Sequence, residues 1–322
     1  MAGRVVVLGG TGFVGRAFAV RAAATVGTAL QLVVPTRRLA SGQALRSLPT
    51  VQLLQARVQD DADLRRVLQG ADAVVNLVAI LHGREADFEQ VHVTLPQRLA
   101  AACAAVGVRR LVHVSALGVG LQAPSMYLRS KARGEAVLQQ AAAGAGGLEL
   151  TLLRPSVIFG AEDRFLNLFA ALQAVFPVMP LGGAGAQLQP VWVGDVAQAL
   201  LQCLADRATV GKTFDIAGPQ VYTLAQLVKL AGARTGRHRP VLPLPAPLAR
   251  LQALTLEFMP GGPLMSRDNL ASLQVPNVAS GTLPGLADLG IEAHSIAQAS
   301  ELESAGAQRD ADLERWRRRH GD

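Results

Sequence analysis

RVVVLGGTGFVG, residues 4–15, places four apolar residues directly before a cluster of four glycines. The apolar residues predict a short buried strand, and the small residues of 12–24 predict a helix. Glycine loses much conformational freedom on folding, so a cluster indicates a tight turn or a close backbone approach. Gly10, Gly12 and Gly15 match G-x-G-x-x-G between strand and helix, the context of a dinucleotide-binding turn. An ordinary glycine turn is the less favoured alternative.

Strand-like and helix-like patterns alternate after this stretch. Half of the residues are hydrophobic and only 4% are aromatic, a composition that suits a parallel sheet covered by helices. The alternation predicts an α/β fold with a doubly wound parallel sheet, the Rossmann fold. The expected strands are 4–10, 30–36, 51–57, 71–79, 108–116 and 148–160, and a long helix is expected to end near Gly107 and another to cover 126–143.

The second half of the chain is less regular and predicts a smaller, substrate-like lobe. We expect the dinucleotide-binding domain to comprise residues 1–160 plus about 188–220, and the lobe about 161–187 and 221–300. Residues 301–322 form a charged tail, expected as a solvated helix or a disordered segment. The apolar, proline-interrupted segment 240–260 either packs inside the lobe, which we favour, or forms a surface that contacts a membrane.

The second strand ends in Thr36-Arg37-Arg38, where the type of dinucleotide is decided. An acidic residue there would bind the ribose hydroxyls of NAD, whereas arginine pairs with the 2′-phosphate of NADP. Residues 1–59 contain seven Arg and no Asp or Glu. We therefore predict NADPH as the preferred cofactor, with NAD as the alternative. The competing interpretation is that Arg37 and Arg38 are ordinary surface residues.

The charge and the cysteines exclude several classes of function. The net charge is +7, carried by 28 Arg and 3 Lys, without a basic block interleaved with aromatic residues. This predicts no nucleic-acid partner but favours anionic ligands or an anionic membrane surface. The two cysteines and six histidines have no metal-ligand spacing, so no metal is expected. A first strand at Arg4 leaves no room for a signal peptide, and we expect a cytoplasmic protein, either free or peripheral to the inner membrane.

GGTGFVG, Tyr127-x-x-x-Lys131 and RPSVIFG together resemble the extended or atypical short-chain dehydrogenases/reductases, the NAD-dependent epimerase/dehydratase-like proteins. YLRSKARGE, RPSVIFGAEDRF, QPVWVGDVA and FDIAGPQVYTLAQLV are more specifically similar to the family of the alpha-subcomplex subunit nine of mitochondrial complex I and its bacterial relatives. The similarity covers about residues 4–230 well and the rest loosely. It implies a Rossmann fold with NADPH at the carboxyl ends of the strands. In the mitochondrial complex this reductase-like subunit holds the nucleotide as a structural part.

The resemblance also implies positions that bind the cofactor. Val58 would cover the adenine, although Arg57 stands where an Asp is usual, and His92 stands where the following helix usually has Asn. The phosphate loop would be Gly9, Gly10, Thr11, Gly12, Phe13, Val14 and Gly15; Arg37 and Arg38 would meet the 2′-phosphate; Asn76, Leu77, Val78 and Ala79 would form the turn after the fourth strand; Pro155 and Ser156 would lie beside the nicotinamide; Tyr127 and Lys131 would contact its ribose.

Tyr127 and Lys131 are four residues apart, so they share one face of the helix expected over 126–143. In short-chain reductases the Tyr transfers a proton, and the Lys lowers the pKa of that Tyr and holds the ribose. The alternative is a surface Tyr and a solvated Lys on an amphipathic helix. The third member of such a triad is a hydroxyl whose position here is occupied by Ala116, with Ser115 one place earlier and pointing the other way.

The triad is therefore either shifted onto Ser115 or incomplete, and this leaves two functions open. The first is an NADPH-binding oxidoreductase-like protein that reduces an unknown carbonyl or quinone-related small molecule. The second is a catalytically retired, nucleotide-holding scaffold or assembly protein that associates with a respiratory complex at a membrane surface.

Overall fold

A seven-stranded parallel sheet forms the centre of the computed structural model, which describes residues 3–144, 147–257 and 265–305. Its strand order, β11-β6-β5-β4-β1-β2-β3, is that of a doubly wound Rossmann sheet and confirms the predicted fold class. The strands are β1 (Gly3–Leu8), β2 (Leu30–Thr36), β3 (Val51–Gln55), β4 (Ala73–Asn76), β5 (Arg110–Val114), β6 (Glu149–Pro155) and β11 (Thr213–Ile216).

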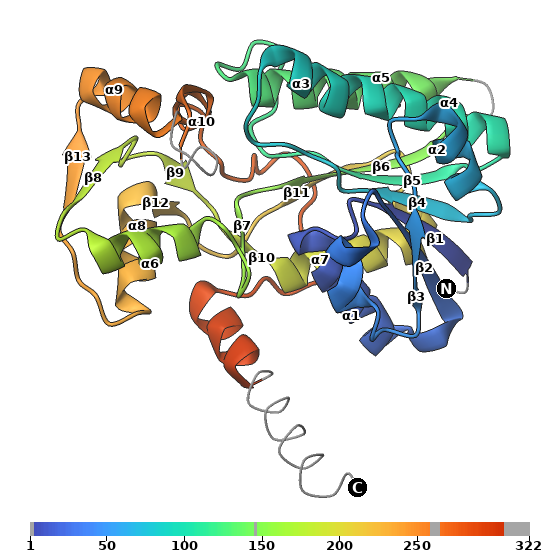
Figure 1. Cartoon of the computed structure of the whole chain (residues 1–322), viewed down its shortest axis with the longest axis horizontal. Coiled ribbons are helices and arrows are strands. Elements are labelled where there is room, and N and C mark those ends of the chain that lie inside the picture. The colour runs from blue at the N-terminus through green and yellow to red at the C-terminus, as the bar shows by residue number, and fades with distance from the viewer. Residues whose placement is uncertain (1–2, 145–146, 258–264, 306–322) are drawn as a thin grey trace, which may run out of the picture.

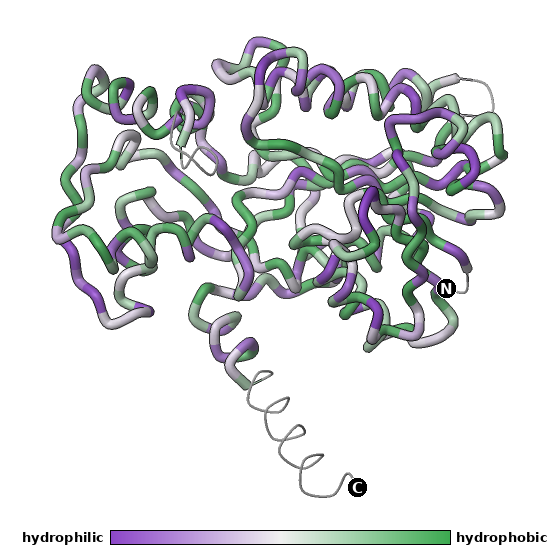
Figure 2. The backbone as a smooth tube through the Cα atoms, in the orientation of Figure 1, coloured by the Kyte–Doolittle hydropathy of each residue, from purple (hydrophilic) through white to green (hydrophobic). Residues whose placement is uncertain are grey.

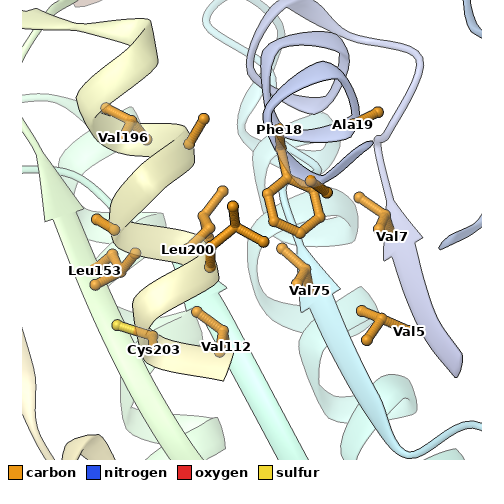
Figure 3. Packing of buried hydrophobic residues seen from close by; sticks show 14 of the residues in the cluster. Val5, Val7, Phe18, Ala19, Val75, Val112, Leu153, Val196, Leu200 and Cys203 are labelled. Carbon is orange, nitrogen blue, oxygen red and sulfur yellow. The ribbon is translucent and has the colours of Figure 1, made fainter. Parts of the chain in front are cut away.

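Helices cover both faces of this sheet (Figure 1). One face packs on α1 (Phe13–Thr25) and α7 (Val193–Ala205), and the other on α2 (Asp61–Leu68), α4 (Leu95–Val106) and α5 (Met126–Ala143). Successive strand residues point to opposite faces, so β1 sends Val5 and Val7 into one core and Val6 and Leu8 into the other. Figure 3 shows Phe18 of α1 and Leu200 of α7 over the sheet in the first core.

The second lobe has a separate apolar core, which includes Leu181, Leu227 and Val228. Because this cluster is distinct from the two sheet cores, we propose the lobe as the second domain. The C-terminal segment then returns to the first core through Leu286, Leu289 and Ile291. The lobe is built from α6 (Leu166–Val175), β8 (Met179–Gly182), β9 (Gln187–Leu188), β12 (Tyr222–Thr223), α8 (Leu224–Ala233), β13 (Val241–Leu244), α9 (Ala246–Glu257) and α10 (Arg267–Ser272).

The helix expected to end near Gly107 is divided into α3 (Glu85–Glu89), the π-helical turn η3 (Gln90–Thr94) and α4. Gly107 ends α4 with a φ of 80°, a left-handed conformation that glycine adopts without strain. The pair β7 (Ile158–Phe159) and β10 (Val191–Trp192) joins the two lobes. Residues 296–305 are helical, and the rest of the predicted charged tail lies outside the described residues. The remaining 3₁₀ turns are η1 (Gly27–Ala29), η2 (Leu39–Leu45), η4 (Arg207–Thr209) and η5 (Ala287–Leu289).

Candidate functional site

The glycine turn lies between β1 and α1, where the strand order reverses. Gly9 has a φ of +79°, which other residues adopt only with strain. A Cβ on Gly15 would lie 2.4 Å from the Cα of Gly10, so the helix packs against the turn only without a side chain. Gly12, at the N-cap of α1, has no side chain that could cap the helix. The turn thus directs a bare helix N-terminus at the crevice and fits a dinucleotide pyrophosphate.

Arg16, which the sequence reasoning missed, connects this turn to the second lobe by hydrogen bonds. Its guanidinium donates a hydrogen bond of 2.8 Å to the carbonyl oxygen of Thr11. Its Nε donates to Glu162 Oε2 at 3.0 Å, and Glu162 lies in the loop between β7 and α6. Phe13 also approaches that loop, since a Cβ on Gly160 would lie 3.1 Å from its ring. Arg16 and Phe13 therefore connect the glycine turn to the loop between β7 and α6.

Arg37 and Arg38 follow β2 and are exposed. The buried hydroxyl of Thr36 donates a hydrogen bond of 3.0 Å to the carbonyl of Arg38, which fixes the backbone at this turn. Neither guanidinium forms a hydrogen bond or ion pair with a residue that the structure describes. Both are thus available to an anionic group at the edge of the crevice.

The turn after β4 is held by buried hydrogen bonds. Asn76 donates to His113 Nδ1 at 3.0 Å and accepts from the backbone N–H of Val78 at 3.2 Å. The N–H of Leu77 donates to the carbonyl of Leu8 at 2.9 Å, so the ends of β4 and β1 are tied together. Ala79 at the end of this turn is exposed. Val58 is half-buried against the second core.

Tyr127 and Lys131 both lie on α5, as predicted, but their protonation differs from the expectation. Lys131 is 2% exposed and donates from Nζ to the carbonyl of Val114 at 2.7 Å. Burial lowers its pKa to about 8, against the opposing effect of the Glu135 carboxylate. Burial also raises the pKa of Tyr127 to about 12, whereas the resemblance implied a lowered value. The reason is that burial disfavours the phenolate form of Tyr127. The Lys131 ammonium, which would stabilise the phenolate, is hydrogen-bonded to the Val114 carbonyl.

His92 connects the turn after β4 to this helix. Its ring packs edge-on against that of Tyr127, with centroids 5.5 Å apart. Its Nε2 accepts a hydrogen bond of 3.1 Å from the N–H of Ile80, so the proton lies on Nδ1. That Nδ1 donates to Ser130 Oγ, which donates to the carbonyl of Tyr127, each at 2.8 Å. Burial and the nearby Lys131 lower the pKa of His92 to about 3, so the ring stays neutral.

The π-helical turn η3 places His92 in this position. Gly134 of α5 packs on it so closely that a Cβ there would lie 1.9 Å from the carbonyl oxygen of His92. π-Helical turns occur frequently at functional sites because they redirect side chains within a helix. Thus η3 and Gly134 act together to bring His92 against Tyr127.

The hydroxyl expected beside Tyr127 is missing from its usual position. Ala116 is buried there, and the Oγ of Ser115 is buried without a hydrogen-bond partner. Ser115 therefore makes no hydrogen bond to Tyr127 or Lys131. Only its backbone is used, since its N–H donates to the carbonyl of Leu153 at 2.7 Å.

Two residues of the second lobe, Asp268 and Asn277, reach the site, and the sequence reasoning found neither. Asp268 accepts hydrogen bonds from the N–H groups of Met126 and Tyr127 at 2.6 and 3.0 Å, and so holds the N-terminus of α5. Asn277 accepts a bond of 2.6 Å from Ser156, which follows Pro155 at the end of β6. A pocket of about 720 Å³ opens between the lobes and is lined by His82, Phe88, Met126, Asp268 and others, but not by Tyr127.

Metal sites and membrane-spanning helices are both absent from the described parts of the chain. No cluster of three or more His, Cys, Asp or Glu there could hold a metal ion. Cys103 and Cys203 are buried free thiols. None of the described helices combines the length and the apolar character needed to cross a bilayer.

Comparisons with known proteins agree with this geometry. The family model described as "NAD dependent epimerase/dehydratase family" matches residues 5–217. The mouse mitochondrial protein NADH dehydrogenase [ubiquinone] 1 alpha subcomplex subunit 9 is 34% identical over 89% of this chain and 75% of its own length. The mitochondrial NADH-ubiquinone oxidoreductase 40 kDa subunit of Neurospora crassa is 29% identical over 90% of this chain and 76% of its own.

A solved structure of similar fold is the NADPH-dependent quinone oxidoreductase QOR2 of Escherichia coli, complexed with NADPH. It has a TM-score of 0.73 and 21% identity, and the match covers 92% of this chain and 99% of that one. At this identity the likeness concerns the fold. From the match to the family model and the similarity to the mouse subunit, the chain belongs to the NAD-dependent epimerase/dehydratase family.

Proposed function

We propose that this protein binds NADPH in the crevice between β1 and β4 and holds it with little or no turnover. The glycine turn and the N-terminus of α1 would receive the pyrophosphate, and Arg37 and Arg38 the 2′-phosphate. Lys131 would hold the nicotinamide ribose from α5. Bound NADPH would supply a hydride. The chain's own groups decide whether an acceptor is positioned and protonated.

The missing hydroxyl beside Tyr127 carries this proposal. A reductase needs a donor that polarises the acceptor carbonyl, and the buried Ala116 cannot supply one. His92 cannot replace it because both ring nitrogens are already hydrogen-bonded, to Ile80 and Ser130. The Tyr127 phenol, with a pKa of about 12, is also a weak acid at neutral pH. Cofactor binding is thus better supported than catalysis.

The comparisons support a respiratory partner. Because the mouse and Neurospora relatives are named as subunits of a mitochondrial NADH–ubiquinone oxidoreductase, we propose that this chain serves as a nucleotide-holding component or assembly factor of a respiratory complex. It would be peripheral to the membrane and located on its cytoplasmic side.

Slow reduction of a carbonyl or quinone-related substrate is the second candidate. It is favoured by the retained Tyr127 and Lys131 pair and by the pocket lined by Met126, which precedes Tyr127 on α5. A neutral phenol could still donate a proton to a carbonyl oxygen, and loss of such an acid typically costs about 10²–10⁴ in rate.

One set of measurements separates these functions. Nucleotide retained by the purified protein is identified, NADPH and NADH are titrated by fluorescence, and NADPH oxidation is followed against carbonyl and quinone panels. We expect tight NADPH binding and no multiple turnover. Steady oxidation by the wild type that is lost in Tyr127→Phe would overturn the holding function and establish the reductase. Failure to bind either nucleotide would overturn both.

A further inference from the structure

The second lobe carries exposed apolar side chains on α6, β13 and α9, which lie at the end away from the Rossmann sheet (Figure 1). Twelve large apolar side chains are exposed among the residues that the structure describes, and seven of them lie within 175–178 and 242–254. We call these seven side chains the apolar ridge. They come from the end of α6 and the loop after it, from β13 and from α9.

Helix α9 has a burial pattern opposite to that of an ordinary surface helix. It buries the small residues Ala249 and Ala253, while Leu248, Leu251 and Leu254 are 51%, 56% and 37% exposed. A surface helix normally buries its large apolar residues and exposes polar ones. Close packing explains the choice of small residues on the inner face, since a Cβ on Gly182 of β8 would lie 2.8 Å from the Cβ of Ala249. Nothing in the described structure covers the leucines.

The parts of the ridge lie next to one another. β13 pairs in parallel with β8, with Leu242 opposite Pro180. The N–H of Met179 donates to the carbonyl of Pro240 at 2.9 Å, which joins the 175–178 loop to the start of β13. Figure 2 shows hydrophobic colour along this outer strand and hydrophilic colour in the loop beside it, which contains residues 234–239.

Positive charge predominates around the ridge. Residues 164–187 and 221–256 contain six Arg and Lys and no Asp or Glu. The acid at the end of α9, Glu257, forms an ion pair of 3.0 Å with Arg267. Arg234, Arg237 and Arg250 are exposed beside the ridge, and Arg239 is held near it by a bond of 3.3 Å from its Nε to the carbonyl of Gln173. Exposed leucines bordered by exposed arginines, with the Glu257 carboxylate paired to Arg267, are complementary to an apolar layer beneath negative charge.

We propose that the apolar ridge docks on the surface of a bilayer that contains anionic phospholipids. The leucines of α9 and the 175–178 loop enter the boundary between headgroups and acyl chains, and the arginines pair with lipid phosphates. This inference deepens the proposed respiratory-membrane association, but it rests only on the second lobe. It is therefore independent of whether NADPH binds or reacts.

Vesicle flotation of the full chain tests the proposal. Vesicles of phosphatidylglycerol and phosphatidylcholine are compared with vesicles of phosphatidylcholine only, at low and high salt. We expect flotation with the anionic vesicles, weakened by salt, and at least tenfold less with the neutral ones. In Leu248→Gln/Leu251→Gln the partitioning should fall about 10- to 100-fold.

Matched controls make a negative result informative. Val20→Gln/Leu121→Gln removes two equally exposed apolar side chains outside the ridge and should float like the wild type. Thermal melts and NADPH titration check that each variant is folded. Wild-type protein that binds neither vesicle overturns the proposal, as does equal binding by the ridge variant. A third outcome also overturns the proposal: the wild type binds no vesicles but is a dimer, and the Leu248→Gln/Leu251→Gln variant is a monomer. In that case a second copy of the chain covers the ridge.

Discussion

We expect the buried Lys131 to make the nucleotide-free wild type less stable than the Lys131→Met variant at neutral pH. Its ammonium is fully buried, and burial lowers its pKa from 10.5 to about 8. At neutral pH this difference corresponds to about 3 kcal/mol of unfavourable free energy. Lys131→Met removes the charge and retains most of the side-chain volume, but it leaves the carbonyl of Val114 without its donor at a cost of about 1–2 kcal/mol. The expected net effect at pH 7 is stabilisation of about 1–2 kcal/mol.

The pH dependence of this effect has a definite sign. A lysine whose pKa is lowered on folding binds fewer protons in the native state than in the unfolded state between about pH 8 and 10.5. The wild type should therefore gain stability, relative to Lys131→Met, as the pH rises through that window. The stabilisation by the substitution should shrink and then reverse, because the unpaired carbonyl remains.

Thermal or urea unfolding of nucleotide-free wild type, Lys131→Met and Lys212→Met, at pH 7 and pH 10, measures this difference. Lys212 is exposed, so its substitution controls for loss of a lysine without loss of a buried charge. NADPH titration runs in parallel, and we expect Lys131→Met to bind more weakly although it is more stable. A variant that is less stable than the wild type at pH 7, or a difference that does not change with pH, refutes the reasoning.

Two further substitutions test other parts of the site. Arg37→Ala/Arg38→Ala should weaken NADPH binding about 100-fold or more and leave NADH binding nearly unchanged, because each charge-assisted hydrogen bond contributes about 1.5–3 kcal/mol; equal affinity of the wild type for both nucleotides contradicts the predicted preference. Gly134→Ala should destabilise the protein severely, since its Cβ would overlap the carbonyl of His92, whereas Gly144→Ala has 3.6 Å to its nearest neighbour and should be tolerated in melts.

The central sheet could be predicted from the sequence because its signals are local. The predicted strand 30–36 and the helix 126–143 match β2 and α5 to the residue, since each is a continuous apolar or amphipathic run with clear ends. The glycine turn was predictable because strand, glycines and helix adjoin in the chain. For the apolar segment 240–260 the sequence left a buried and a surface position open and favoured the buried one, since a leucine-rich run normally indicates a buried helix; the exposed leucines of α9 fit the surface position. Exposure depends instead on how closely Ala249 packs on β8.

The rest of the site depends on contacts between distant segments, for which the sequence carries no local signal. Asp268 caps a helix that begins more than 140 residues earlier, and only the fold of the second lobe brings its carboxylate there. The protonation of Tyr127 shows the same limit. The spacing of Tyr127 and Lys131 is local and indicated that they share a helix face. The pKa values follow from burial, which opposes the charged forms on which proton transfer depends. A binding motif can thus persist in the sequence while the surrounding packing weakens the chemistry it usually supports.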